Sequence, residues 1–319
     1  MIVTLTPNPS QDRTVVLETS LVRGAVQRVV SESSQAGGKG VNISRASVSA
    51  GIASIAVLPA PDDDPFVHEL LAAGIDCRPV PHRASPRVNI AITEPDGTTT
   101  KLNSPGVPVT AATLDDLAQA LRRRAETADW IVLAGSLPPG APTDWYATLV
   151  ADLAGGAARI AVDTSDEPLR ALVAHLPQAA PHLMKPNGAE LASFTGGDGD
   201  ELESDPVAAA RAARTLVDAG VETVLATLGG HGAVLVTRDG AWHATPPPTT
   251  VVSTVGAGDS SLFGYLLGDL RQLAPAPRLA LAVAYGSAAA GLPGTTIPLP
   301  AQVHPDLVTV RELLDTQGG

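Results

Sequence analysis

The stretch Val255-Gly256-Ala257-Gly258-Asp259-Ser260 is the most informative one in this chain. A strand-like segment, Thr250-Val251-Val252, precedes it, and apolar residues at helical spacing follow it over 262–267. The glycines let the backbone approach a ligand, and the N–H groups that open the next helix favour negative charge there. An aspartate beside an anion site is explained if the site holds a phosphoryl group and needs a base for the attacking hydroxyl. The alternative is that Gly258 makes a turn and Asp259 is only a helix N-cap.

Composition narrows the class of protein. The chain has 319 residues, of which 44% are hydrophobic, enough for one large α/β domain or two smaller ones. The net charge of −12 excludes nucleic acid as an expected partner. The single cysteine, Cys77, excludes an intramolecular disulfide and CxxC metal sites, and it favours a reduced, cytoplasmic setting. The run from Leu279 to Leu292 is too short to span a bilayer and predicts a buried helix, so no membrane partner is expected.

Apolar runs of strand length alternate with helical stretches, which predicts a mostly parallel sheet that is covered on both faces. Two helix starts are predicted at Asp64-Pro65 and Asp205-Pro206, because each pair places an N-cap residue before a proline. The proline-rich stretches 246–248 and 275–277 predict loops. The apolar runs lie at 2–5, 55–58, 131–134, 160–162, 224–226 and 234–236.

Two segments differ from this alternation and predict a small antiparallel layer. One combines 15–17 with 27–30, and the other is a hairpin of 87–94 and 98–102 joined by Pro95-Asp96-Gly97. We expect a discontinuous β lid, from about 12–33 and 86–104, over a site at the carboxyl ends of the parallel strands.

A second glycine-rich loop, Gly37 to Asn42, opens a helix. It is not a Walker A loop, because Gly40 follows Lys39 where that motif needs Ser or Thr. Lys39 and Asn42 would supply hydrogen-bond donors to a substrate that approaches the backbone. The alternative is a tight turn with a solvated lysine.

Three further segments have both a functional and a structural interpretation. In Lys185 to Glu190, Asn187 and Glu190 could orient phosphate or the hydration shell of Mg²⁺, or they could form a capping box. The segment 228–233 is a loop under a nucleotide or a plain glycine-rich hairpin. The turn 135–140 follows a strand, where open sheets place ligand-contacting loops. No G-x-S-x-G, complete G-x-G-x-x-G or H-E-x-x-H motif is present, which weakens hydrolase, dehydrogenase and metalloprotease interpretations.

In this order, the motifs resemble the ribokinase-like sugar kinases of the phosphofructokinase B branch. The matches run from Asn8-Pro9 to the helix after Asp259 and cover most of the chain. Within that family the chain is most similar to bacterial 1-phosphofructokinases, in the segments 6–14, 37–42, 87–89 and 103–106.

The resemblance implies a single ribokinase-like kinase domain over 1–319, a three-layer α/β sandwich with a mostly parallel central sheet and a small β lid. It implies an ATP-dependent enzyme that uses Mg²⁺ and converts fructose 1-phosphate to fructose 1,6-bisphosphate. By resemblance, the sugar is held by Asp12, Gly38, Lys39 and Asn42, and its phosphate by Arg87 with Arg28. The resemblance assigns the nucleotide phosphates and Mg²⁺ to Lys185, Asn187 and, through water, Glu190, and it places Thr227, Gly229 and Gly232 by the nucleotide. It also implies that Gly256, Ala257 and Gly258 form the anion hole and that Asp259 is the base.

Departures from the family pattern leave the exact phosphosugar open. Pro7 and Pro86 are unusual, and Ala91 stands where many 1-phosphofructokinases carry a lysine. Tagatose 6-phosphate or fructose 6-phosphate kinase activity stays an alternative, as does a catalytically idle phosphosugar sensor. A kinase for unphosphorylated sugars or nucleosides is disfavoured by Arg87 and Lys39.

The lid predicts a homodimer. A small β layer has exposed edges and one apolar face, and Val15, Leu17, Val88 and Ile90 are available to cover that face. This expectation rests partly on the resemblance, because related kinases often pair their lids.

Overall fold

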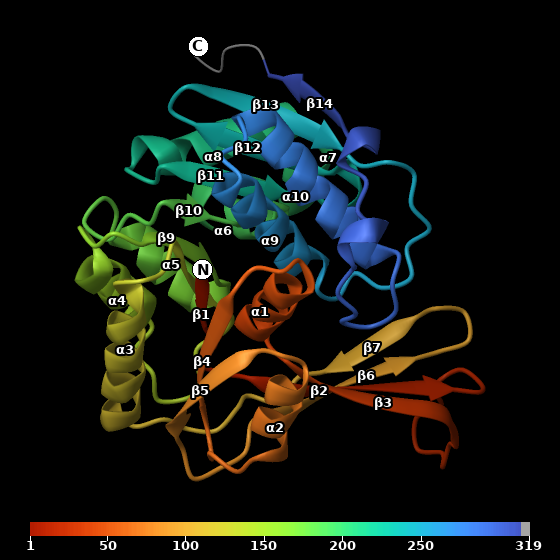
Figure 1. Cartoon of the computed structure of the whole chain (residues 1–319). Helices are drawn as coiled ribbons and strands as arrows, with labels where there is room; N and C mark the ends of the chain where they lie inside the picture. Colours follow the sequence, from red (N-terminus) through yellow and green to blue (C-terminus); the bar gives the residue numbers. More distant parts are fainter. Residues whose placement is uncertain (314–319) are drawn as a thin grey trace.

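A ten-stranded sheet forms the centre of the protein (Figure 1). The structure is a computed structural model that describes residues 1–313. Across the sheet the strands follow the order β14 (Thr309–Glu312), β13 (Gly240–Thr245), β12 (Ala233–Thr237), β11 (Thr223–Thr227), β10 (Leu183–Met184), β9 (Arg159–Asp163), β8 (Trp130–Ala134), β1 (Ile2–Leu5), β4 (Ser54–Ala60) and β5 (Asp76–Pro81). The strands from β5 to β11 run parallel, whereas β12, β13 and β14 are antiparallel additions at one edge.

Helices cover both faces of this sheet, which confirms the predicted three-layer α/β sandwich. The short 3-10 helices are η1 (Gly229–His231), η2 (Pro300–Gln302) and η3 (Pro305–Leu307). One face carries α3 (Ala111–Ala125), α4 (Trp145–Leu153), α5 (Asp166–Ala174), α6 (Gly188–Thr195), α7 (Gly199–Ser204) and α8 (Pro206–Asp218), and the other carries α1 (Lys39–Ser49), α2 (Pro65–Ala72), α9 (Ala257–Leu270) and α10 (Pro275–Ala290).

The parallel strands are buried on both faces because successive side chains point to opposite sides. In β8, Ile131 and Leu133 belong to the core under α3 to α8. Trp130 and Val132 belong to the core under α1, α9 and α10. This double burial explains why these strands read as continuous apolar runs in the sequence.

The predicted helix starts at two Asp-Pro pairs are confirmed. A side-chain oxygen of Asp64 accepts a hydrogen bond from the N–H of Phe66 at the start of α2. Asp205 likewise accepts from the N–H groups of residues 207 and 208 at the start of α8. The buried helix predicted over 279–292 is found as α10, which contains most of that run. Among residues 1–313, no helix has both the length and the apolar composition that crossing a membrane requires.

Two local predictions are wrong. The prolines of 275–277 open α10 instead of forming a loop, because the first turn of a helix needs no donor from proline. The β-branched segment 250–252 is a loop, and the side chains of Val251 and Val252 are 62% and 57% exposed. The N–H of Val252 donates to the carbonyl oxygen of Ala290 at the end of α10 and not to a neighbouring strand.

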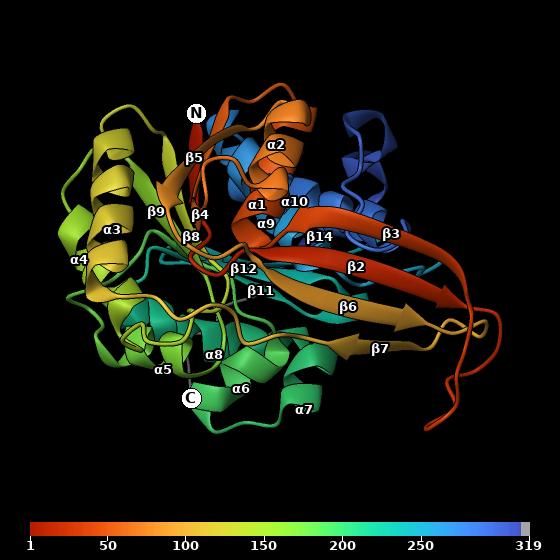
Figure 2. The same ribbon diagram turned by 90° about the horizontal axis from the view of Figure 1, so that it is seen from below.

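A second, four-stranded sheet projects from the body (Figure 2). Its order is β3 (Val29–Gly37), β2 (Ser10–Leu17), β6 (Arg87–Thr93) and β7 (Thr99–Leu102). We call this sheet the lid. The predicted hairpin around Pro95-Asp96-Gly97 joins β6 and β7. The layer is not wholly antiparallel, however, because β2 and β6 both leave the body at the same end and so run parallel, with Ser10 opposite Arg87.

Candidate active site

The candidate site lies along the carboxyl ends of the parallel strands. Asp163 ends β9, Ser136 follows β8, and Lys185 follows β10. The lid rises from the same edge, directly after β1. Open α/β sheets bind ligands at this edge, because the loops there diverge and leave backbone groups unpaired.

The glycine turn before α9 has the local geometry that an anion-binding element needs. Gly256 is the N-cap of the helix and has a φ of 80°, a left-handed conformation that favours glycine. A Cβ at position 258 would lie 3.3 Å from the ammonium nitrogen of Lys185, so the lysine reaches close to the backbone of this turn. The N–H groups that open α9, the helix dipole and a buried ammonium group therefore lie close together.

Asp259 lies at the third position of α9 and is only 7% exposed. Gly256, not Asp259, occupies the N-cap position, and no side chain caps this helix, so the capping interpretation is wrong. The side-chain amide of Asn42 donates to Oδ2 of Asp259 over 2.8 Å. Burial raises the pKa of Asp259 above its ordinary value; the charge of Lys39 opposes that rise and the charge of Asp163 adds to it. The carboxylate is thus oriented and is a stronger proton acceptor than a solvated aspartate.

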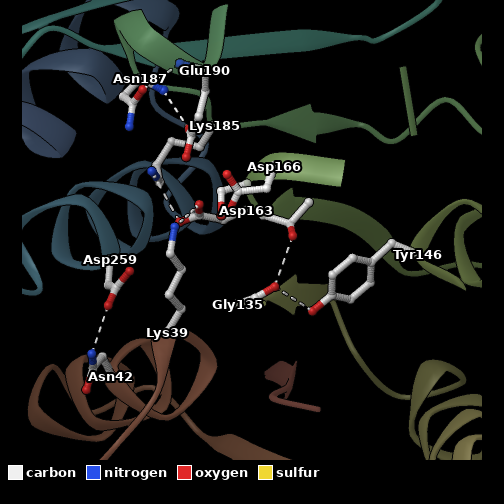
Figure 3. A network of polar contacts seen from close by, with 12 residues as sticks. Lys39, Asn42, Gly135, Tyr146, Asp163, Asp166, Lys185, Asn187, Glu190 and Asp259 are labelled. Atoms are coloured by element: carbon white, nitrogen blue, oxygen red, sulfur yellow. Dashed lines mark hydrogen bonds and ion pairs between the residues drawn. The ribbon is translucent and has the colours of Figure 1, made fainter. Parts of the chain in front are cut away.

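A fully buried carboxylate, Asp163, joins two lysines of the site (Figure 3). The ammonium nitrogen of Lys39 lies 2.6 Å from its Oδ1, and that of Lys185 lies 3.2 Å from its Oδ2. Burial alone would raise the pKa of Asp163, but the two lysines hold it below its ordinary value. Lys39 is thus part of an ion-pair network and not a solvated turn residue. The sequence analysis did not single out Asp163; the available signal was a carboxylate ending the apolar run 160–162.

The glycine-rich loop over 37–42, which we call the substrate loop, packs against the base of the lid. A Cβ at position 37 would lie 2.3 Å from Oδ2 of Asp12, so the aspartate occupies space that glycine leaves free. Asp12 also accepts hydrogen bonds from Ser10 Oγ (2.7 Å) and Asn89 Nδ2 (3.0 Å). Gly38 is the N-cap of α1, so Lys39 and Asn42 lie on the first turn of this helix, just after the glycine at position 37 that contacts Asp12.

Arg87, at the base of β6, is half-buried, and its hydrogen-bond partners are neutral oxygens. Its guanidinium donates to the carbonyl oxygen of Ser104 (2.6 Å) and more weakly to Oγ of Ser136 (3.4 Å). Among residues 1–313, no carboxylate lies within 4.0 Å of it. The preceding carbonyl, of Gly135, accepts from Tyr146 Oη and Thr164 Oγ1, both at 3.0 Å, which holds the turn of Ser136 in place. Ser136 belongs to the turn 135–140, which was predicted from the sequence as a ligand-contacting turn without any single residue being named.

Arg28 does not join Arg87 within one chain. It is exposed, in the connection between β2 and β3. Arg87 pairs with Ser10 at one end of β2, whereas Val29 pairs with Leu17 at the other end. Seven residue steps of strand separate these ends, or roughly 23 Å.

The predicted nucleotide residues gather beside this cluster. Asn187 and Glu190 form a capping box at the start of α6: Asn187 Oδ1 accepts from the N–H of Glu190 (2.7 Å), and Glu190 Oε2 accepts from the N–H of Asn187 (2.9 Å). The N–H of Thr227, at the end of β11, donates to the carbonyl oxygen of Pro186. Gly229 and Gly232 lie in the β11–β12 hairpin, which confirms the structural interpretation of that segment. The nucleotide interpretation of both segments stays a prediction.

A cleft of about 330 Å³ separates the lid from the body. The side-chain oxygen of Thr295 donates to Gln35 of the lid over 2.8 Å and so closes one wall of the cleft. Its lining includes Asp12, Thr14, Asn89, Ser253 and Thr295. Apolar side chains, among them Val16, Ile90 and Val252, line the cleft as well.

Comparison with known proteins agrees with this geometry. The family model described as "pfkB family carbohydrate kinase" matches residues 11–302. The chain is 36% identical to 1-phosphofructokinase of Rhodobacter capsulatus, over 95% of this chain and 94% of that protein. It is 34% identical to 1-phosphofructokinase of Escherichia coli K12, over 90% of each. Its fold is similar to phosphofructokinase-2 of Escherichia coli, solved with substrates and products, with a TM-score of 0.86, 27% identity, and coverage of 94% of this chain and 96% of that one.

Proposed function

The chain belongs to the pfkB family of carbohydrate kinases, and from this we propose that it transfers the terminal phosphoryl group of ATP to fructose 1-phosphate. The product would be fructose 1,6-bisphosphate. The observation that supports catalysis best is the buried Asp259 on a glycine turn that also receives the ammonium group of Lys185. The choice of sugar follows the curated relatives, which are 1-phosphofructokinases over nearly their whole length.

The reaction follows from the positions of these groups. The free hydroxyl of the sugar attacks the terminal phosphorus of ATP, its proton passes to the carboxylate of Asp259, and ADP leaves. The hydrogen bond from Asn42 fixes the carboxylate in orientation. The N–H groups of Gly256, Ala257 and Gly258, with Lys185, stabilise the charge on the transferring group.

Substrate binding is assigned to the lid and the substrate loop. Asp12, held by Ser10 and Asn89, would accept hydrogen bonds from sugar hydroxyls. Arg87 and Ser136 would hold the phosphate that the sugar already carries. The lid borders this cleft and would exclude water once both substrates are bound, because water would otherwise compete for the phosphoryl group.

The nucleotide would lie along the loop of Lys185 and Asn187 and the hairpin of Thr227, Gly229 and Gly232. Among residues 1–313, no group of three or more His, Cys, Asp or Glu side chains could hold a metal ion alone. Glu190 nevertheless fits a Mg²⁺ that is bound mainly by phosphates and water, because its capping hydrogen bond uses only Oε2. Bound there, Mg²⁺ would neutralise charge on the nucleotide phosphates.

A substrate panel tests the function. Purified protein with ATP and Mg²⁺ should release ADP with fructose 1-phosphate at a kcat/KM at least about tenfold above that with fructose 6-phosphate, tagatose 6-phosphate or fructose. Phosphorus NMR should identify fructose 1,6-bisphosphate as the product. Preference for a 6-phosphate would reassign the substrate, and calorimetric binding of fructose 1-phosphate without ATP consumption would establish a sensor. Equal activity on fructose and fructose 1-phosphate would contradict a phosphosugar kinase.

We also propose that the protein is a homodimer through the outer face of the lid. Successive strand residues point to opposite faces, and Asp12 and Thr14 line the cleft, so Val15 and its partner Ile92 face outward. Leu102 of β7 is 53% exposed. Leu17, in contrast, is only 6% exposed within the chain, so it is not available to a partner as expected. A cytoplasmic location is proposed as well, since ATP and sugar phosphates carry too much charge to cross a bilayer unaided.

Light scattering on the size-separated protein tests the dimer. The wild type should have twice the mass of one chain, and Val15→Asp should shift it to the monomer, because a charge would be buried in the interface. Val207→Asp is the matched control: Val207 is 38% exposed on α8, which packs on β11 and β12 of the body, and its replacement should leave the dimer intact. A monomeric wild type at assay concentration would contradict the proposal.

A further inference from the structure

One carboxylate connects the substrate loop and the nucleotide loop of the site. Lys39 belongs to the substrate loop and Lys185 to the nucleotide loop, yet both ammonium groups meet Asp163 (Figure 3). The connection spans the sequence, since Lys39 and Asp163 are 124 positions apart. No motif of the sequence analysis contained Asp163, and the mechanism above gives it no role.

The burial of this ion-pair network makes Asp163 necessary for its geometry. The side chain of Asp163 has no exposed surface, and that of Lys185 is 5% exposed. A buried ammonium group is tolerated only when an opposite charge and hydrogen bonds compensate for its lost hydration. Within the described part of the chain, Asp163 is the carboxylate that pairs with Lys185, and it also pairs with Lys39.

We propose that Asp163 is a positioning residue that holds the ammonium groups of Lys39 and Lys185 beside the glycine turn before the phosphorylated ligands bind. The lysines then need no rearrangement when the phosphates arrive, which is how a preorganised site accelerates phosphoryl transfer. The inference deepens the proposed function and rests on it for its kinetic readouts, but the ion-pair geometry can be tested without activity.

Asp163 also affects the base through its charge. The ionisable groups around it are Lys39 from α1, Lys185 after β10, Asp259 from α9, Glu190 from α6 and Tyr146 from α4. The negative charge of Asp163 adds to the burial effect that raises the pKa of Asp259. Replacing Asp163 with a neutral side chain therefore lowers the pKa of Asp259, and the acid limb of the kcat/KM profile moves to lower pH.

The first test is kinetic and compares Asp163→Asn with Asp166→Asn. Asp166 is an exposed carboxylate three positions away, and asparagine tolerates its positive φ of 57°. Asp163→Asn should lower kcat/KM about 100-fold, because the lysines lose their common anchor, and should shift the acid limb to lower pH. Asp166→Asn should match the wild type. A wild-type rate and pH profile for Asp163→Asn would overturn the proposal, as would recovery of its rate at high Mg²⁺, which would place Asp163 in metal binding.

The second test follows lysine reactivity and needs no catalysis. The chain has only three lysines, at 39, 101 and 185, so each yields its own peptide for mass spectrometry after reductive methylation. Burial alone would lower the pKa of Lys39, but Asp163 and Asp259 raise it well above the ordinary value. In the wild type, the labelling rate of Lys39 should therefore keep rising above the pH range in which an ordinary lysine loses its proton.

In Asp163→Asn the pH dependence of Lys39 labelling should move toward that of an ordinary lysine. If this variant does not fold, the wild-type measurement still decides, since an ordinary pH dependence of Lys39 labelling would overturn the proposal. An inactive wild type with a protected Lys39 would refute the kinase function and leave the ion-pair geometry standing. An active wild type in which Lys39 is labelled like an ordinary lysine would support the kinase function and refute the ion-pair geometry.

Discussion

Asp259→Asn should lower kcat by about 10²- to 10⁴-fold, the usual contribution of a general base. Asparagine keeps the size of aspartate and can still bond to Asn42, but it cannot accept the proton of the attacking hydroxyl. The glycine N–H groups and Lys185 remain, so the Kd values of both substrates should change little. Single-turnover kinetics and calorimetric binding on this variant separate the two effects.

The wild type should show the protonation of the same carboxylate. Because burial raises the pKa of Asp259, the base is lost through protonation at a higher pH than an ordinary aspartate would be. The kcat/KM profile should therefore fall on its acid side above the ordinary aspartate range, and Asp259→Asn should lack this limb. A kcat near that of the wild type would refute the assignment, since the structure leaves Asp259 no alternative role as N-cap.

Local signals explain which parts of the fold could be predicted. The starts of α2 and α8 are set by Asp-Pro pairs, whose capping depends on residues within one turn. The parallel strands are buried on both faces, so their apolar character alone identifies them. Composition alone misidentifies the segment 250–252. It is β-branched like a strand, but the N–H of Val252 donates to the carbonyl oxygen of Ala290 at the end of α10 and not to a partner strand.

The missed features depend on contacts between distant parts of the chain. The parallel pairing of β2 and β6 is decided by where the chain re-enters the lid after two strands and two helices of the body. Asp163 is one carboxylate after a short apolar run, and its importance appears only when Lys39 and Lys185 reach it from other loops. Arg28 lies at the end of the lid strands opposite to Arg87, so the two residues do not meet within one chain, and its role in phosphate binding stays a prediction.

Arg87→Ala should raise the KM for the phosphosugar by about 10- to 100-fold, because hydrogen bonds to a charged group are worth roughly 1.5–3 kcal/mol. The KM for ATP should change far less, since Arg87 lies at the base of the lid and contacts Ser104 and Ser136. Calorimetric Kd values should follow the KM values if Arg87 acts in binding and not in the chemical step. Arg83→Ala is the control, because Arg83 is exposed in the segment that leads into β6.

The decisive quantity is the ratio of kcat/KM for fructose 1-phosphate to that for fructose. The fixed partners of Arg87 in the described chain are neutral oxygens, so its loss should weaken the phosphosugar and leave unphosphorylated fructose little affected. The ratio should therefore collapse toward unity in Arg87→Ala and stay at the wild-type value in Arg83→Ala. Equal loss on both sugars, or an equal rise in the KM for ATP, would mean that Arg87 supports the turn of Ser136 and does not bind the phosphate.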